Sequence, residues 1–358
     1  MLVAVARAGV LAQPPTSPSS SRKPTAAESA AAERRLTDAV RRDPDSFEAH
    51  YQLASFYLQQ GKLDSALPHR ERACMIDPSN YSSGYDLALA RLEKGKLDEA
   101  RAQIARMIGE QDTAELHNLL GNVEERAGNL NGADEQYELA AHLAPTEEHL
   151  FEWGNNLLQL QAFDEAAQVF TGAIKRHPQS ARLHIGLGIA AYSRGQYEDA
   201  VRSMCQAADL APSDPRPYQF LGDMYGVAPA LGGEITTRLA RFAKAHPRNA
   251  LAQFHYAMSL WKGQPAAPPP ADMRRVEALL RQAVTLDRRL AKGFLELGIL
   301  LSDQQRHKEA IPELRRAAEL EPDLAQAHYR LAQAYQRTGQ QALAAKELEI
   351  FERLNARN

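Results

Sequence analysis

Small residues recur along the chain at a nearly constant spacing, and a large apolar residue precedes each of them. They stand at Ala54, Ala88, Gly121, Gly154, Gly188, Gly222, Ala257, Gly298 and Ala332. Their separations are 33 to 35 residues, except for 41 residues between Ala257 and Gly298. A second small residue follows twelve positions later in most periods, as Ala66 and Ala100 illustrate. Small residues at fixed offsets let two helices approach closely, so this period predicts an array of packed helices.

Most periods contain the turn residues and the helix-ending residues expected of an antiparallel helix pair. Glycines separate the two halves of most periods, at Gly61, Gly95, Gly128, Gly195 and Gly339. Prolines follow the second half, at Pro78, Pro145, Pro178, Pro212 and Pro322. Glycine suits a tight turn and proline ends a helix, so we expect a helix, a turn and a second helix in every period.

This pattern resembles the tetratricopeptide repeat. The signature residues of that family stand in the fifth period as Leu187, Gly188, Ala200, Ala207 and Pro212. The resemblance extends over about nine repeats, from Phe47 to the end of the chain. It implies an all-α fold, a right-handed superhelical solenoid of antiparallel helix pairs, in which each repeat packs on its neighbours.

The domain organisation expected from the sequence has five parts. Residues 25–46 form a capping helix, residues 47–214 form repeats one to five, and residues 291–358 form repeats eight and nine. Between them, residues 215–290 form two divergent repeats with a proline-rich insertion at 263–272, which we expect to loop out of the array. Residues 1–24 are expected to be a signal remnant and a disordered linker rich in proline and serine.

The first residues resemble the end of a secretory signal, with Val10 and Ala12 at the positions that precede a cleavage site before Gln13. Two features depart from such a signal, since no basic residue stands between Met1 and the apolar run and Arg7 interrupts that run. We therefore expect a periplasmic or secreted protein, with a cytoplasmic one as the alternative.

Composition excludes several classes of protein. The net charge of −3 and the 44% of hydrophobic residues are typical of a folded chain and give no bulk basic charge for nucleic acid. Only Cys74 and Cys205 are present, which excludes a disulfide framework, and we expect both to be buried apolar residues. No metal-binding or nucleophile motif occurs, so we expect a noncatalytic protein without a cofactor. No apolar run is long enough to span a membrane.

In the resembling family, the first helix of each repeat lines the concave, peptide-binding side. Carried over by position, the third repeat presents Glu115, Asn118, Asn122 and Glu125, and the fourth presents Glu148, Phe151, Asn155 and Leu158. Asparagine can pair with the backbone of a bound peptide or merely solvate the surface, and the aromatic residues can anchor a ligand or merely pack. The candidate groove residues are Tyr51, Tyr85, Asn118, Asn122, Phe151, Asn155, Asn156, Tyr192, Phe254, Trp261 and Tyr329.

Charge is unevenly distributed along the array. Residues 110–165 hold thirteen acidic residues and one basic residue, a net of −12, and residues 238–292 hold eleven basic and three acidic residues, a net of +8. We expect a protein or peptide partner, with self-association through these two segments as a further option.

The predicted function is a scaffold that binds a peptide or a partner helix. The alternative is a substrate-delivery or assembly subunit whose enzyme is a separate chain.

Overall fold

The computed structural model describes residues 25–263 and 269–356, and every regular element in these ranges is a helix. The predicted all-α solenoid of helix pairs is confirmed. The expected signal remnant and linker, and residues 264–268 of the expected insertion, lie outside the described residues. The described chain separates into two compact units, one ending at Arg176 and one beginning at His177. We call them the N-terminal unit and the C-terminal unit, while the five-part division expected from the sequence stays a prediction.

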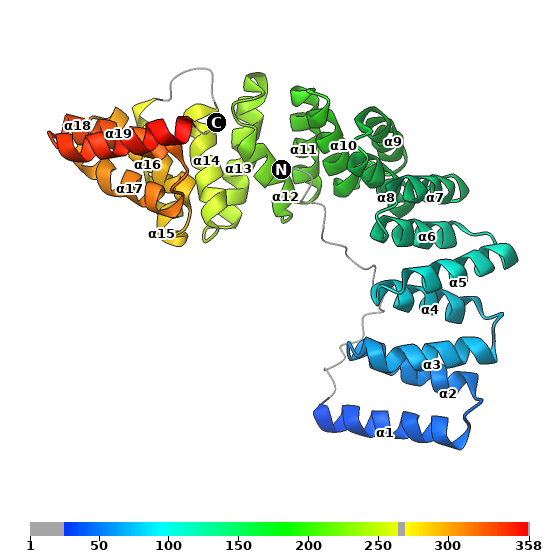
Figure 1. The fold of residues 1–358 in the computed structure, drawn as a ribbon. Helices are drawn as coiled ribbons and strands as arrows, with labels where there is room; N and C mark the ends of the chain where they lie inside the picture. The colour runs from blue at the N-terminus through cyan, green and yellow to red at the C-terminus, as the bar shows by residue number, and fades with distance from the viewer. Residues whose placement is uncertain (1–24, 264–268, 357–358) are drawn as a thin grey trace. The chain divides into compact units, whose positions relative to one another are not determined.

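The N-terminal unit stacks nine helices in chain order (Figure 1). It opens with α1 (Ala26–Arg42), which packs against α2. The first helices of its four pairs are α2 (Phe47–Gln59), α4 (Tyr81–Glu93), α6 (Ala114–Arg126) and α8 (Glu147–Gln159). The second helices are α3 (Leu63–Ile76), α5 (Leu97–Glu110), α7 (Leu130–Leu143) and α9 (Phe163–Arg176).

The first helices begin where the sequence supplies a capping side chain. Ser46, Asn80, Thr113 and Thr146 each precede a first helix and accept a hydrogen bond from a backbone N–H of its first turn. These side chains satisfy N–H groups that have no partner within the helix. The caps recur with the same period as the small residues, which fixes the start of each repeat.

Glycine on the first helix makes room for a large side chain of the second helix. A Cβ atom added to Gly121 would lie 2.6 Å from the ring of Tyr137, and one added to Gly154 would lie 2.7 Å from the ring of Phe170. Both rings are completely buried. The predicted close approach of the paired helices is therefore confirmed, and it depends on the missing side chain at these two positions.

The turn between paired helices requires a left-handed backbone conformation. All five predicted turn glycines adopt it, with φ between 68° and 81°. Gln161 and Gln305 take the same position in two other repeats, with φ of 60° and 64°. This conformation costs a residue with a side chain more than it costs glycine, so these two turns were not evident from the sequence.

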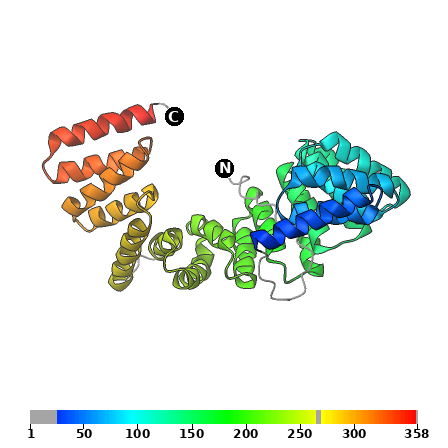
Figure 2. The same cartoon turned by 90° about the horizontal axis from the view of Figure 1, so that it is seen from below.

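The C-terminal unit contains the remaining helices, and Figure 2 shows the last of them, orange to red, side by side. Its regular pairs are α10 (Ala181–Ser193) with α11 (Tyr197–Leu210), α14 (Ala250–Lys262) with α15 (Pro270–Leu286), α16 (Ala291–Asp303) with α17 (His307–Leu320), and α18 (Ala325–Arg337) with α19 (Gln341–Asn355).

The sixth repeat departs from the regular pairing, as its sequence suggested. It consists of the short helix α12 (Pro215–Asp223), the 3₁₀ turn η2 (Pro229–Leu231) and α13 (Gly232–Ala245). Gly222 of α12 faces His255 of α14 in place of a residue of its own second helix, since an added Cβ would lie 2.2 Å from the His255 ring. The following repeat therefore supplies the packing that the sixth repeat lacks.

The boundary of the proline-rich insertion needs a correction. The sequence predicted a loop over residues 263–272, but α15 begins at Pro270. Proline is accepted in the first turn of a helix because its missing N–H would have no helical partner there. The prediction for the cysteines is confirmed, because Cys74 and Cys205 are both free and buried.

Candidate functional site

Successive first helices of the N-terminal unit lie against one another, α4 against α6 and α6 against α8. Along α6, Glu115, Asn118, Asn122 and Glu125 follow at intervals of three, four and three residues, which places them on one side of the helix. Glu148 and Asn155 are seven residues apart on α8 and share a side in the same way. We call the surface formed by Tyr85, Glu115, Asn118, Asn122, Glu125, Glu148 and Asn155 the acidic face.

Glu125 is held in place by uncharged donors from two other helices. The hydroxyl of Tyr137 on α7 lies 2.8 Å from Asn122 Oδ1 and 2.9 Å from Glu125 Oε2. Gln159 on α8 donates from Nε2 to Glu125 Oε1 over 2.7 Å. Burial raises the pKa of Tyr137, and the Glu125 charge raises it further, so the phenol stays protonated and donates. The Glu125 carboxylate is thus positioned without being neutralised.

The third repeat differs from its neighbours in the side chain that packs against the small residue of its first helix, which here is Tyr137 against Gly121. The residues equivalent to Tyr137 in the neighbouring pairs are Ile104 and Phe170, which have no hydroxyl. Among the second, third and fourth repeats, only the third therefore places a buried tyrosine hydroxyl against its first helix.

The asparagines divide into three environments. Asn118 is only 7% exposed, and its Oδ1 atom has no hydrogen-bond partner in the described structure. Asn122 Oδ1 shares the single proton of the Tyr137 hydroxyl with Glu125. Asn155 is partly exposed and makes no hydrogen bond to the described residues. Among the described residues, Asn118 therefore has a buried side-chain oxygen without a partner, and Asn155 has a partly exposed amide without one.

Asn156 needs a correction, because it is completely buried and does not belong to the acidic face. Its Nδ2 atom donates to the Leu130 carbonyl over 3.0 Å and ties α8 to α7. Asn155 and Asn156 differ by about 100° around the helix axis, so adjacent positions face different neighbours. The sequence prediction treated them as equivalent.

Tyr85 on α4 lies near the carboxylates of Glu115 and Glu148. Its ring stacks on Tyr81 with 6.3 Å between centroids. Burial, followed by the neighbouring Tyr81 hydroxyl and the charges of Glu148 and Glu115, raises the pKa of Tyr85 to about 12. The two carboxylates therefore act on the same phenol, although they come from different helices.

The predicted aromatic anchors have different surroundings. Tyr51 is partly exposed, donates to Asp86 Oδ2 over 2.9 Å and lies under the Arg70 guanidinium. Phe151 is partly exposed and lies 6.3 Å from Phe170 between ring centroids.

In the C-terminal unit, Tyr192 packs edge-on against Phe220. Trp261 lies under Lys262, and Tyr329 is exposed beside Phe351. The prediction that Phe254 is an exposed anchor needs a correction. It is 7% exposed and belongs to an apolar cluster with Leu295 and Ile299 of the next repeat, which leaves a ligand little to contact.

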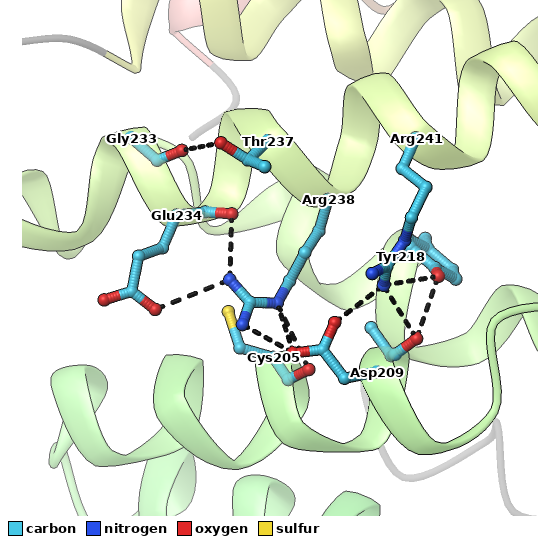
Figure 3. A network of polar contacts seen from close by, with 9 residues as sticks. Cys205, Asp209, Tyr218, Gly233, Glu234, Thr237, Arg238 and Arg241 are labelled. Carbon is cyan, nitrogen blue, oxygen red and sulfur yellow. Dashed lines mark hydrogen bonds and ion pairs between the residues drawn. The ribbon is translucent and has the colours of Figure 1, made fainter.

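Part of the basic segment of the C-terminal unit is paired within the chain. Figure 3 shows Arg238 and Arg241 of α13 converging on Asp209 of α11. The shortest distances are 2.6 Å from Arg238 and 2.7 Å from Arg241. Arg241 also donates to the Tyr218 hydroxyl and to the Ala208 carbonyl. These contacts fasten the irregular sixth repeat to the fifth.

Sequence reasoning placed Glu115, Glu125 and Glu148 at surface positions of the first helices but passed over them as candidate site residues. It also missed Tyr137, which orients Glu125 from a completely buried position. The signal for Tyr137 was an aromatic residue on the second helix opposite a glycine on the first. The signal for the carboxylates was the single base, Arg126, among the residues from 110 to 165.

The described residues contain no group of histidine, cysteine, aspartate or glutamate side chains suited to holding a metal ion. None of the helices in residues 25–263 and 269–356 combines the length and the apolar character needed to cross a membrane.

Paired helices with a glycine contact, a left-handed turn and a period of about 34 residues define a helical repeat protein. Two family models described as tetratricopeptide repeat match residues 25–81 with 151–215, and residues 57–123. A third model, described as TPR repeat, matches residues 300–339. The chain belongs to the tetratricopeptide repeat family. No curated protein matches it.

Several solved structures are similar to the chain. The C-terminal part of a TPR repeat-containing protein from Cytophaga hutchinsonii has a TM-score of 0.55 at 12% identity, covering 69% of this chain and 99% of its own. A tetratricopeptide repeat protein from Parabacteroides merdae has a TM-score of 0.46 at 17% identity, covering 80% and 98%. YrrB, described as a TPR protein with an unusual peptide-binding site, has a TM-score of 0.41 at 19% identity, covering 52% and 96%. The first of these supports the shared fold.

Proposed function

We propose that the protein is a noncatalytic scaffold that binds a peptide segment or a partner helix on the acidic face of its N-terminal unit. The main support for this proposal is Asn118, whose buried side-chain oxygen has no hydrogen-bond partner among the described residues. Leaving a buried amide oxygen unpaired costs about 1 to 3 kcal/mol, so such an atom in a folded protein calls for an explanation. A ligand backbone that occupies the face would supply the missing partner.

The surroundings of Asn118 support a backbone ligand. An asparagine amide both donates and accepts, which matches one peptide unit of an extended chain. Asn155 offers a second unpaired amide on the adjacent first helix. Two amides on neighbouring repeats can hold a segment that crosses from α6 to α8 whatever its side chains are.

Substitution of the two asparagines tests the proposal. We would compare the proteins retained from the source cell by the wild-type chain, by Asn118→Ala with Asn155→Ala, and by Asn131→Ala. Asn131 is exposed on α7, outside the acidic face, and serves as the control. We expect quantitative mass spectrometry to show partners that the double variant loses and the control keeps. Equal retention by all three chains, with unchanged helicity, contradicts the proposal.

The compartment stays a prediction that rests on the sequence of residues 1–12. We propose export, and sequencing the amino terminus of the mature protein after cell fractionation tests it. A mature chain in the extracytoplasmic fraction that begins near Gln13 is the expected result, and full-length chain in the cytoplasm contradicts it.

A further inference from the structure

The charges of the acidic face are not balanced by the protein itself. Glu115, Glu125 and Glu148 form no ion pair with any residue that the structure describes. Nearby, Glu124 on the same helix pairs with Arg101 over 2.6 Å, and Glu110 pairs with Arg106. Basic side chains therefore pair with neighbouring carboxylates, but none of those described pairs with Glu115, Glu125 or Glu148.

The acidic face also carries features that point to a ligand. Asn118 lies between Glu115 and Asn122 on the helix surface, nine-tenths buried, with an unpaired oxygen. Tyr137 and Gln159 fix Glu125, so the carboxylate is oriented before any ligand arrives. The ring of Tyr85 adds an aromatic surface, on which a guanidinium can stack.

We propose that the acidic face binds a protein segment that carries arginine or lysine side chains, laid in extended form along α6 and within reach of α4 and α8. This inference rests on the proposed function and adds the chemistry of the partner. The asparagines hold the backbone of the segment, and the three carboxylates select its cationic side chains. Arginine matches an oriented carboxylate particularly well because it can donate two parallel hydrogen bonds.

The spacing of the carboxylates sets the spacing of the cations. Glu115 and Glu125 are ten residues apart on α6, which corresponds to about 15 Å along the helix. An extended peptide covers this distance in about five residues. A ligand with two arginines about five residues apart can therefore reach both carboxylates.

A second copy of this chain could offer only part of its basic segment to the acidic face. The basic residues of the segment 238–292 include Arg238 and Arg241, which share Asp209, and Lys262, which pairs with Glu296 over 2.6 Å. Arg281 pairs with Glu277 over 2.9 Å. To bind the acidic face, these four side chains would have to leave partners that they already have, whereas the other basic residues of the segment form no ion pair with the described residues.

The test measures binding of a fluorescent peptide with two arginines about five residues apart in a glycine and serine background. A matched peptide carries glutamine in place of both arginines. The protein is the full chain, as wild type, as the variant Glu115→Gln with Glu125→Gln and Glu148→Gln, and as the control Glu135→Gln with Glu138→Gln and Glu165→Gln. The control removes the same charge from exposed positions of α7 and α9.

We expect the arginine peptide to bind the wild type, to bind the acidic-face variant about tenfold more weakly, and to bind the control within about twofold of wild type. Equal weakening by both variants would mean attraction by net charge alone and would overturn the inference. Equal affinity for the glutamine peptide would also overturn it while leaving the proposed function standing. If the wild type binds neither peptide, the inference is wrong, and the asparagine variants still decide the proposed function separately.

Discussion

The acidic segment 110–165 and the basic segment 238–292 look like mirror images in the sequence but differ in structure. Arg238, Arg241 and Lys262 of the basic segment are paired within the chain, as Figure 3 shows for the first two. In the acidic segment, Glu115 and Glu148 are exposed on the first helices without a cation. Four basic residues of this segment, the three named above and Arg281, therefore hold helices of the C-terminal unit together, whereas Glu115 and Glu148 make no such ion pair with the described residues of the N-terminal unit.

The difference follows from the repeat period. Asp209 and Arg238 are 29 residues apart, and Lys262 and Glu296 are 34 residues apart, so each partner comes from an adjacent repeat. The residue 34 positions after Glu125 is Gln159, which donates a hydrogen bond but carries no charge. The net charge of a segment is therefore a poor guide in a repeat protein, because the decisive residue lies one repeat away.

Loss of Asp209 is expected to have the largest effect on stability. Burial alone would raise the pKa of Asp209, but the hydrogen bonds from Arg238 and Arg241 outweigh it and lower the pKa. Asp209→Asn should lower the free energy of unfolding by about 2 kcal/mol, a value discounted because about a third of the side chain remains in solvent. Trp261 fluorescence during urea unfolding, in a Trp153→Phe background, reports on the C-terminal unit.

Asp199→Asn is the matched control, because Asp199 lies on the same helix and makes an exposed ion pair with Arg202. It should cost less than about 0.5 kcal/mol. Equal losses from the two substitutions would show that the Asp209 network does not fasten α13 to α11.

Acidification should weaken the C-terminal unit through His255. Burial lowers the pKa of His255, and Lys292 lowers it further, while Asp223 and the Gly222 backbone act in the opposite direction. The unfolded chain then binds a proton near pH 6.5 that the folded chain does not bind. Stability is therefore full above this pH and falls as the pH drops from 6.5 towards the folded-state pKa, by at most about 1.4 kcal/mol per pH unit.

His255→Gln should make the free energy of unfolding of the C-terminal unit less dependent on pH between 7 and 5. Urea titrations at several pH values, followed by Trp261, measure this slope. An unchanged slope in the variant contradicts the role given to His255.

Asn118→Leu should have a smaller effect of the opposite sign. Leucine has the same number of side-chain heavy atoms as asparagine and the same branching at Cγ, and it removes the unpaired oxygen, so the free energy of unfolding of the N-terminal unit should rise by about 1 kcal/mol. Trp153 fluorescence in a Trp261→Phe background measures it.

Asn156→Leu is the comparison for Asn118→Leu. It removes the hydrogen bond to the Leu130 carbonyl and should destabilise the unit. If Asn118→Leu also destabilised it, Asn118 would be part of the fold rather than a residue kept for a ligand.

The repeat period was enough to predict the helix pairs, the turn glycines and the close packing at Gly121 and Gly154. Small residues and caps act locally, so the sequence displays them directly. The site was less predictable. Asn155 and Asn156 look alike in sequence, and only the rotation of α8 decides that the second is buried. The repeat position of Phe254 predicts a groove residue, but residues of the next repeat cover it.

The most direct test of the account is to locate a bound cationic peptide on the full chain. The arginine peptide, carrying a photoreactive benzophenone, would be cross-linked to the protein and the adducts mapped by mass spectrometry. The account predicts adducts on α4, α6 and α8 that disappear when Glu115, Glu125 and Glu148 are changed to glutamine. Adducts on the second helices α7 and α9, or adducts that persist in this variant, would contradict it.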